Sequence, residues 1–277
     1  MSSTTPTALS PDSTPTDGGA MQHERPTRER IVMRDVISAQ GWDHDPVGAT
    51  SAMVITVTDH VAALPRRWWG KALVWNPELP GPATTFSWDL LARITDAADA
   101  DRIAENLFSV VRDEAALYFV PEATLLTANL LLAAVRGRRS LTDVLDWIHS
   151  GDLSEPYQLL HANGESGPTA DLDTFGETPA GEQAAIWAVV RQAMLPLDHS
   201  MILAALSAQT GVLPGVGPLP VLEAAALTAR REVFVVEVPG TRSAGAAAAL
   251  RAELLLAAQE AGLVVRVVSV GPLRRGA

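Results

Sequence analysis

Residues 52–77, AMVITVTDHVAALPRRWWGKALVWNP, decide the fold of this chain. The stretch opens with an apolar, β-branched run, Met53 to Val57, and closes with a second apolar run, Ala72 to Trp75. Two runs of strand length, joined by a short polar and helical segment, are typical of a strand–helix–strand crossover in a parallel sheet. Such crossovers commonly belong to α/β cores that bind nucleotides.

The residues that hold nucleotide phosphates in such a core are missing from the sequence. Lys71 is the single lysine in 277 residues, and no G-x-x-x-x-G-K-[ST] loop occurs. In P-loop proteins this loop surrounds the phosphates with backbone N–H groups, and its lysine contacts the β and γ phosphates. We therefore expect part of a P-loop motor without its catalytic machinery.

Composition narrows the class of protein further. The net charge of −11 and the pI near 5.0 argue against direct nucleic-acid binding, which needs a cationic surface. Without cysteine the chain forms no disulfide and offers no thiolate nucleophile or cysteine-based metal site. Of the 21 lysine and arginine residues all but Lys71 are arginine, which indicates a GC-rich bacterial genome.

Residues 1–28 are expected to form a disordered tail. The first twenty are mainly Ser, Thr, Pro, Gly and Asp, and bury too little apolar surface to offset the entropy of ordering. They lack the apolar segment of a signal peptide. No run in the chain approaches the roughly 18 apolar residues of a membrane-spanning helix. We expect a soluble, cytoplasmic protein with no membrane span.

Apolar periodicity divides the rest of the chain. Strands are expected at 53–57, 72–75, 233–238 and 263–270. From about residue 96 the apolar period changes to 3.6, as in helices. We predict an α/β core in two parts, residues 29–94 and 230–277, separated by an all-α insertion at 95–229. The predicted fold class is α/β, a partial P-loop (RecA-like) parallel sheet with a large all-α insertion.

Capping signals place the helices of the insertion. Asp96 is a candidate N-cap, and Pro121 suits the first position of a second helix. Ser140-Leu-Thr-Asp143 is similar to a capping box. A polar stretch at 150–177 is expected to be a loop, after which Thr178-Pro179 opens a long helix.

Residues 171–182 are similar to a calcium-binding EF-hand loop. Asp171 and Asp173 fall at ligand positions, and Glu182 falls at the twelfth position. Phe175, however, stands where an oxygen ligand is needed, so we expect a polar surface loop and no calcium site. Histidine also gives no metal site, because the six histidines show no zinc-binding spacing. They stand at 23, 44, 60, 149, 161 and 199.

Three further features are weighed as sites. Phe234-Val-Val-Glu237 resembles a strand that ends in a magnesium-directing acid, but buried strands often end this way, and we expect a structural role. Trp68-Trp69, beside arginines, is a candidate partner contact, whereas the other tryptophans are expected in the core. Paired arginines are expected to be solvated, the alternative being a patch for nucleic acid or acidic partners. They stand at 66–67, 138–139, 230–231 and 274–275. We assign no catalytic, cofactor-binding or metal-binding residue and expect no cofactor.

A series of short patterns runs collinearly over about residues 50 to 262. Val54-Ile-Thr-Val-Thr-Asp59 and Val74-Trp-Asn-Pro77 open the series. The later members are Trp88-Asp-Leu-Leu91, Tyr118-Phe119, Ala128 to Ala134, Gly137 to Trp147, Thr178 to Leu197 and Val233 to Gly240. Together they resemble the type IV coupling proteins, the TraD/TraG-like ATPases of conjugative DNA transfer, in their actinobacterial form.

The resemblance fails at both ATPase motifs. It implies a phosphate loop just before residue 50, where only Gly48-Ala-Thr50 is similar to the beginning of that loop. It implies a magnesium-binding acidic strand near residue 262, where the sequence is VVRVVSVGP. The helical insertion, which in the family faces the pore entrance and helps to select the DNA–protein substrate, is retained.

We therefore expect a pseudo-ATPase, a non-catalytic component of conjugative DNA transfer or type IV secretion. It would act by protein contact, on a coupling ATPase or a relaxase complex. One alternative is a subunit that completes an ATPase site in trans in a mixed hexamer, through Arg230 or Arg242. The other is a secretion accessory protein that does not handle DNA, which genomic neighbours would distinguish.

Overall fold

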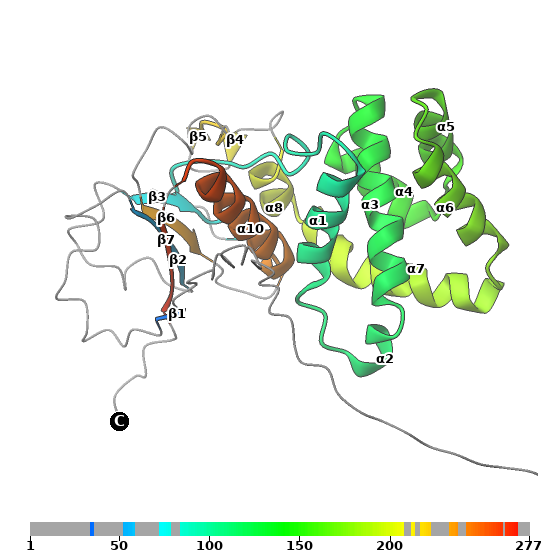
Figure 1. Ribbon diagram of the computed structural model, residues 1–277, viewed down its shortest axis with the longest axis horizontal. Coiled ribbons are helices and arrows are strands. Elements are labelled where there is room, and N and C mark those ends of the chain that lie inside the picture. The colour runs from blue at the N-terminus through cyan, green and yellow to red at the C-terminus, as the bar shows by residue number, and fades with distance from the viewer. Residues whose placement is uncertain are drawn as a thin grey trace, which may run out of the picture. The chain divides into compact units, whose positions relative to one another are not determined.

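The computed structural model describes residues 34–35, 52–58, 72–78, 84–207, 212–213, 217–222, 233–237, 242–262 and 264–270 (Figure 1). All of these residues belong to one compact unit, Val32–Ala277. The expected tail at 1–28, the crossover segment at 59–71 and Gly48-Ala-Thr50 lie outside the described residues.

Five strands form a sheet in which every described pairing is parallel. They are β1 (Arg34–Asp35), β2 (Ala52–Thr58), β3 (Ala72–Trp75), β6 (Val233–Glu237) and β7 (Val264–Val270). Their order in space is β1-β7-β2-β6-β3. The central strand β2 pairs with β6, Val54 opposite Val233, and with β7, Ala52 opposite Val264. The sheet therefore joins segments that the helical part separates in sequence.

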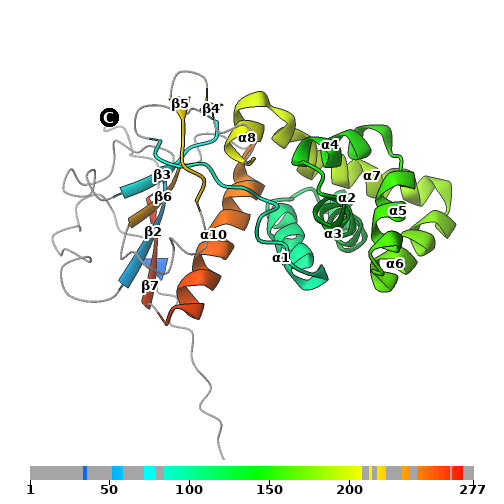
Figure 2. The same cartoon turned by 90° about the horizontal axis from the view of Figure 1, so that it is seen from above.

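Residue type explains these strands. β2 (AMVITVT) and β7 (VVRVVSV) consist mainly of β-branched residues, which pack well on a pleated surface. Ile55, Trp75 and Val236 are fully buried. Helix α10 (Ala244–Glu260) packs against β2, β6 and β7 (Figure 2). Parallel strands covered in this way are typically apolar almost throughout. β2, β3, β6 and β7 occupy the four ranges in which strands are expected.

The large helical part is confirmed. Its helices are α1 (Ala97–Phe108), α2 (Glu114–Leu117), α3 (Val120–Gly137), α4 (Leu141–Ser150), α5 (Ser154–Ala162), α6 (Ser166–Glu177), α7 (Ala180–Met194), the 3₁₀ helix η3 (Leu195–Asp198) and α8 (Ser200–Ala205). Among the described residues no helix is both long and apolar enough to cross a membrane.

The expected helix starts are confirmed in atomic detail. The Asp96 side chain accepts a hydrogen bond from the backbone N–H of Asp99 at the start of α1. Ser140 and Asp143 form a complete capping box at the start of α4. Pro121 lies in the first turn of α3, where its missing N–H has no intrahelical partner to lose.

The loop expected at 150–177 is wrong, because α5 and α6 occupy most of it. Pro156 and Pro168 each stand in the first turn of a helix, where proline is tolerated. Gly164, with φ of +75°, makes the corner between the two helices. The turn-forming residues therefore mark helix starts and one corner.

The range expected to be an all-α insertion, 95–229, also contains a few extended residues. Strands β4 (Val212–Leu213) and β5 (Gly217–Pro218) form a short antiparallel ladder within that range. In addition, Ser87 forms an isolated parallel bridge with Val221. A small β element therefore follows α8.

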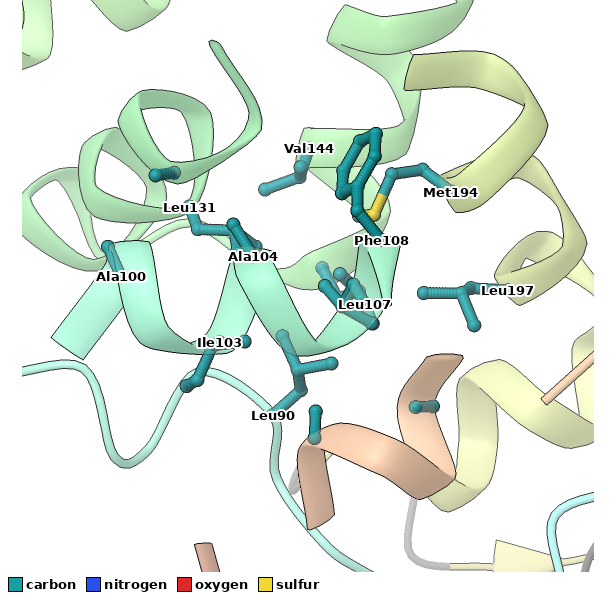
Figure 3. Packing of buried hydrophobic residues seen from close by; sticks show 14 of the residues in the cluster. Leu90, Ala100, Ile103, Ala104, Leu107, Phe108, Leu131, Val144, Met194 and Leu197 are labelled. Carbon is teal, nitrogen blue, oxygen red and sulfur yellow. The ribbon is translucent and has the colours of Figure 1, made fainter. Parts of the chain in front are cut away.

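One hydrophobic core runs through the helices and reaches the sheet. Figure 3 shows the inward face of α1 at its centre, packed against residues of α3, α4, α7 and η3. The labelled side chains are Leu90, Ala100, Ile103, Ala104, Leu107, Phe108, Leu131, Val144, Met194 and Leu197. The spacing of the α1 members, at intervals of three and four, puts them on one face of that helix.

Helices α1 and α10 lie side by side (Figures 1 and 2) and approach closely at a glycine. A Cβ atom added to Gly245 would lie 2.6 Å from the carbonyl oxygen of Leu107. Glu253, also on α10, has a side chain only 3% exposed. Its carboxylate lies 3.0 Å from Nε of Arg93 and 2.9 Å from Nη2 of Arg102. Small residues and a buried ion-pair network thus fix this contact.

Candidate docking surface on the helical part

The large apolar side chains that are exposed in the described part of the chain stand close together in sequence, at the end of α2 and the beginning of α3. They are Leu117 (50% exposed), Tyr118 (76%) and Leu125 (42%), within nine residues of α2 and α3. The Tyr118 ring packs edge-on against that of Phe119, with the ring centroids 4.9 Å apart. Exposed apolar groups that gather in this way are typical of surfaces that bind another molecule. We call these three side chains the α2–α3 corner.

A groove between α1 and α3 lies next to this corner. It has a volume of about 470 Å³, and Phe108, Val120 and Leu125 contribute its apolar wall. Asp101 and Glu105, from the outward side of α1, provide carboxylates along its edge. We call it the α1–α3 groove. It is large enough to receive side chains from a partner.

A smaller pocket opens on the other side of Leu125, between α3, α6 and α7. Its volume is about 110 Å³, and its apolar walls include Leu126, Leu172, Phe175 and Ile186. Leu125 lines both this pocket and the α1–α3 groove, so the two hollows share one ridge. We call it the Asn129 pocket, after the amide side chain among its lining residues.

Both hollows carry negative charge. Asp101 and Glu105 line the groove, and the pocket is lined by carboxylates too, namely Glu122, Asp171 and Glu182. None of the described residues that line either hollow is basic. Partial burial, followed by repulsion from Glu105 and Asp171, raises the pKa of Asp101 above its ordinary value. The carboxylates therefore repel one another, which favours a cationic occupant.

Nearby arginines are engaged elsewhere. Arg102 on α1 pairs with Asp99 and Glu253. Arg112 donates hydrogen bonds to the carbonyl oxygens of Ser109 and Val111 beyond the end of α1. Because these guanidinium groups are already paired, the carboxylates of the two hollows remain available to a partner.

The residues of the EF-hand-like stretch do not form a calcium loop. Asp171 and Asp173 lie within the regular helix α6, whereas Glu182 belongs to α7. Among the described residues, no group of three or more His, Asp or Glu side chains is placed to hold a metal ion. His149, His161 and His199 are each exposed.

The other candidate residues are the paired arginines, Glu237 and the tryptophans. Arg138, which ends α3 with a φ of 53°, and Arg139 are both exposed, and Arg139 pairs with Glu155. The remaining arginine pairs and Trp68-Trp69 lie outside the described residues, as does the Glu237 side chain. The tryptophans in the described ranges are buried, as expected: Trp75, Trp88, Trp147 and Trp187.

The α2–α3 corner was not singled out from the sequence, although a signal for it exists. In the sequence Leu125 begins the apolar stretch Leu125 to Val135, which by itself favours a core position. In a helix beginning near Pro121, however, Leu125 falls one turn after Pro121 and Glu122, which are both exposed. Its position on the outer face could have been predicted from this spacing.

The sheet, the long helical part and their order define a coupling-protein-like fold, as expected. Among solved structures the chain is similar to the bacterial conjugative coupling protein TrwBdeltaN70 in an unbound monoclinic form, with a TM-score of 0.50. Sequence identity is 13%, and the match covers 79% of this chain and 55% of that structure. The chain thus spans little more than half of that structure's length, and a likeness at this identity shows the fold alone. No protein-family model and no curated protein matches the sequence.

Proposed function

We propose that this chain is a non-catalytic, coupling-protein-like component of conjugative DNA transfer or type IV secretion. It acts by protein contact, through the α2–α3 corner and its two adjoining hollows. The partner is a complete coupling ATPase or a relaxase complex. The coupling-protein-like fold supports the biological setting, and the sequence, which lacks a P-loop lysine, supports the absence of catalysis.

The observation that carries this proposal is the exposure of Leu117, Tyr118 and Leu125, the last of which lines both acidic hollows. Aromatic and aliphatic side chains at the centre of a contact, surrounded by polar groups, are typical of protein interfaces. The carboxylates that line the two hollows help to orient an approaching partner, because complementary charge steers association.

Purified coupling ATPase and relaxase from the same transfer system test the docking. Calorimetric titration should show that one of them binds the wild-type chain. Binding to the double variant Leu117→Ser, Tyr118→Ser should be at least about tenfold weaker. The double variant Gln158→Ser, Gln192→Ser changes exposed residues of α5 and α7 and is the matched control. Equal binding by both double variants, or no binding of either partner to wild type, contradicts the proposal.

The absence of catalysis has a separate test. Calorimetry of the full-length chain with Mg-ATP is expected to show no binding. Micromolar binding would instead point to a phosphate site near Gly48 to Ser51 and would overturn the non-catalytic part of the proposal. The docking test above does not depend on this result.

A second candidate function is completion of an ATPase site in trans. The exposed Arg242, on the turn before α10, favours it. The next residue, Ser243, is held by Glu78, whose Oε1 accepts hydrogen bonds of 2.8 Å from both its backbone N–H and its hydroxyl. Arg242 thus projects from an anchored turn. If Arg242→Ala leaves the ATPase rate of the mixed assembly unchanged, Arg242 has no such role.

A further inference from the structure

The Asn129 pocket has room for one side chain. Its volume of about 110 Å³ compares with the roughly 150 Å³ of an apolar cavity that holds a benzene molecule. Leu126, Leu172, Phe175 and Ile186 make its walls apolar. A single aliphatic side chain, such as that of leucine or methionine, matches this size and polarity.

The side-chain amide of Asn129 requires a hydrogen-bonding group on any ligand that fills the pocket. Asn129 is 4% exposed and lines the pocket, and its Nδ2 is buried without a hydrogen-bond partner. A buried amide group without a partner destabilises a folded protein. Because Nδ2 makes no hydrogen bond, the carboxamide keeps an unused donor for a ligand. The carbonyl group of a peptide backbone offers the matching acceptor.

The rim of the pocket adds a requirement for charge. Glu122, Asp171 and Glu182 come from three different helices, and the pocket has no basic residue among its described lining. The repulsion between Asp171 and Asp101, which contributes to the raised pKa of Asp101, extends this negative field to the α1–α3 groove. A lysine or arginine beside the aliphatic residue would relieve this repulsion.

We propose that the Asn129 pocket binds one aliphatic side chain of a partner protein segment, with Asn129 hydrogen-bonded to the adjacent backbone and the rim carboxylates facing an adjacent lysine or arginine. This inference rests on the proposed function, since it names the chemistry of the partner that docks there. A protein segment fits better than a free amine, because the much larger α1–α3 groove lies on the other side of Leu125 and can receive further residues of the segment.

The test uses a short, capped peptide of alanine and glycine that contains one Leu-Arg pair. NMR titration of the full-length chain should shift the side-chain amide signals of Asn129. Peptides with the leucine changed to alanine, or the arginine to glutamate, should bind about tenfold more weakly. Equal binding of all three peptides overturns the proposal, and so does equally tight binding of 3-methylbutylamine, which carries the aliphatic and cationic groups without a backbone.

Two variants distinguish recognition from a structural role. Asn129→Leu replaces the unpaired amide with an apolar group, so it should raise the melting temperature while peptide binding is lost. Thr127→Val is the matched control. The Thr127 hydroxyl is also buried on α3 without a hydrogen-bond partner, but Thr127 does not line the pocket. Thr127→Val should therefore leave peptide binding unchanged. If Asn129→Leu lowers the melting temperature and retains peptide binding, Asn129 is structural and the inference is wrong.

Binding of the intact coupling ATPase or relaxase distinguishes this inference from the proposed function. If the coupling ATPase or relaxase binds Asn129→Leu as tightly as wild type but binds the Leu117→Ser, Tyr118→Ser variant weakly, the docking function stands and the inference falls. If neither partner binds the wild-type chain, the proposed function falls. Loss of partner binding in Asn129→Leu, with Thr127→Val unaffected, supports both.

Discussion

Glu253 illustrates how a single buried charge depends on its partners. Its carboxylate is almost completely removed from water, yet it lies within 3.0 Å of two arginine side chains that are each about a quarter exposed. A buried carboxylate needs such partners, because desolvation alone strongly disfavours its ionised form. Arg93 precedes α1 and Arg102 lies within it, so Glu253 connects α10 to both segments.

Replacing Glu253 with glutamine is therefore expected to destabilise the protein. The substitution removes the buried anionic partner that the two arginines share and lowers the free energy of unfolding by about 2–3 kcal/mol, measured by urea denaturation. Glu260→Gln is the control. Its side chain is 57% exposed and lies 3.8 Å from Arg93, so a change within about 0.5 kcal/mol is expected. Similar effects of the two substitutions would show that burial of Glu253 is unimportant.

At the scale of elements, the capping residues were sufficient to locate the starts of helices. Proline and glycine residues, by contrast, led to the wrong prediction of a loop at 150–177. Asp96 and Ser140 accept hydrogen bonds from backbone N–H groups at helix starts, and this local chemistry is visible in the sequence. Residues 150–177 appear irregular in composition, yet they fold as α5 and α6. Leu160 and Leu172 of this segment are both buried, and their tertiary packing outweighs the weak helix propensity of the proline, glycine and asparagine residues around them.

Ser140→Ala should destabilise α4 in a pH-dependent way. Partial burial acts to raise the pKa of Asp143, but hydrogen bonds from the Ser140 hydroxyl and backbone N–H hold it below its ordinary value. The stabilisation is therefore present above the unfolded pKa of about 3.9 and is lost as pH falls through the lower folded pKa. At pH 7 the substitution should lower the free energy of unfolding by about 1 kcal/mol.

Urea denaturation of wild type and Ser140→Ala, repeated from neutral to acidic pH, measures this effect. The difference between the two proteins should shrink as the medium becomes more acidic than the folded pKa of Asp143. A difference that stays constant with pH would show that the Asp143 carboxylate takes no part.

The contact between α1 and α10 predicts a second effect at the element scale. Gly245→Ala places a methyl group against the backbone of α1 at Leu107, and backbone cannot move aside as a flexible side chain can. We expect the free energy of unfolding to fall by about 1–3 kcal/mol. Gly181→Ala, in the first turn of α7 with open space around its Cβ, should be neutral or stabilising. Thermal unfolding of both variants measures the contrast, and equal melting temperatures would contradict it.

For the whole molecule, the coupling-protein-like fold could be expected from the order of patterns along the chain, but the candidate surface could not. The apolar runs and capping signals are local, whereas the surface brings Asp101, Leu125 and Asp171 together from three different helices. Their proximity depends on how α1, α3 and α6 pack. Sequence periodicity alone does not determine that packing.

The charge of the whole molecule predicts how docking depends on salt. A net charge of −11, with acidic hollows beside the docking corner, should attract a cationic partner surface over a distance comparable to the Debye length, about 10 Å at 0.1 M salt. Raising the ionic strength should slow association severalfold and change dissociation less. Stopped-flow kinetics measures both rates.

The double variant Asp101→Asn, Glu105→Gln should show a weaker dependence of association rate on salt. Glu177→Gln, which changes an exposed carboxylate at the end of α6, is the control and should resemble wild type. An association rate that is independent of ionic strength would exclude electrostatic steering at this surface.

The strand order has a consequence for synthesis on the ribosome. β6 lies between β2 and β3, so these early strands cannot complete their pairing until residues 233–237 have left the exit tunnel. At about 5–20 residues per second, the wait is roughly 10–30 seconds. During that time the unpaired edges of apolar strands are open to association with other nascent chains. The helical part, which contains mainly local contacts, can fold first, and production of the intact protein should therefore depend on chaperones that shield the waiting strands.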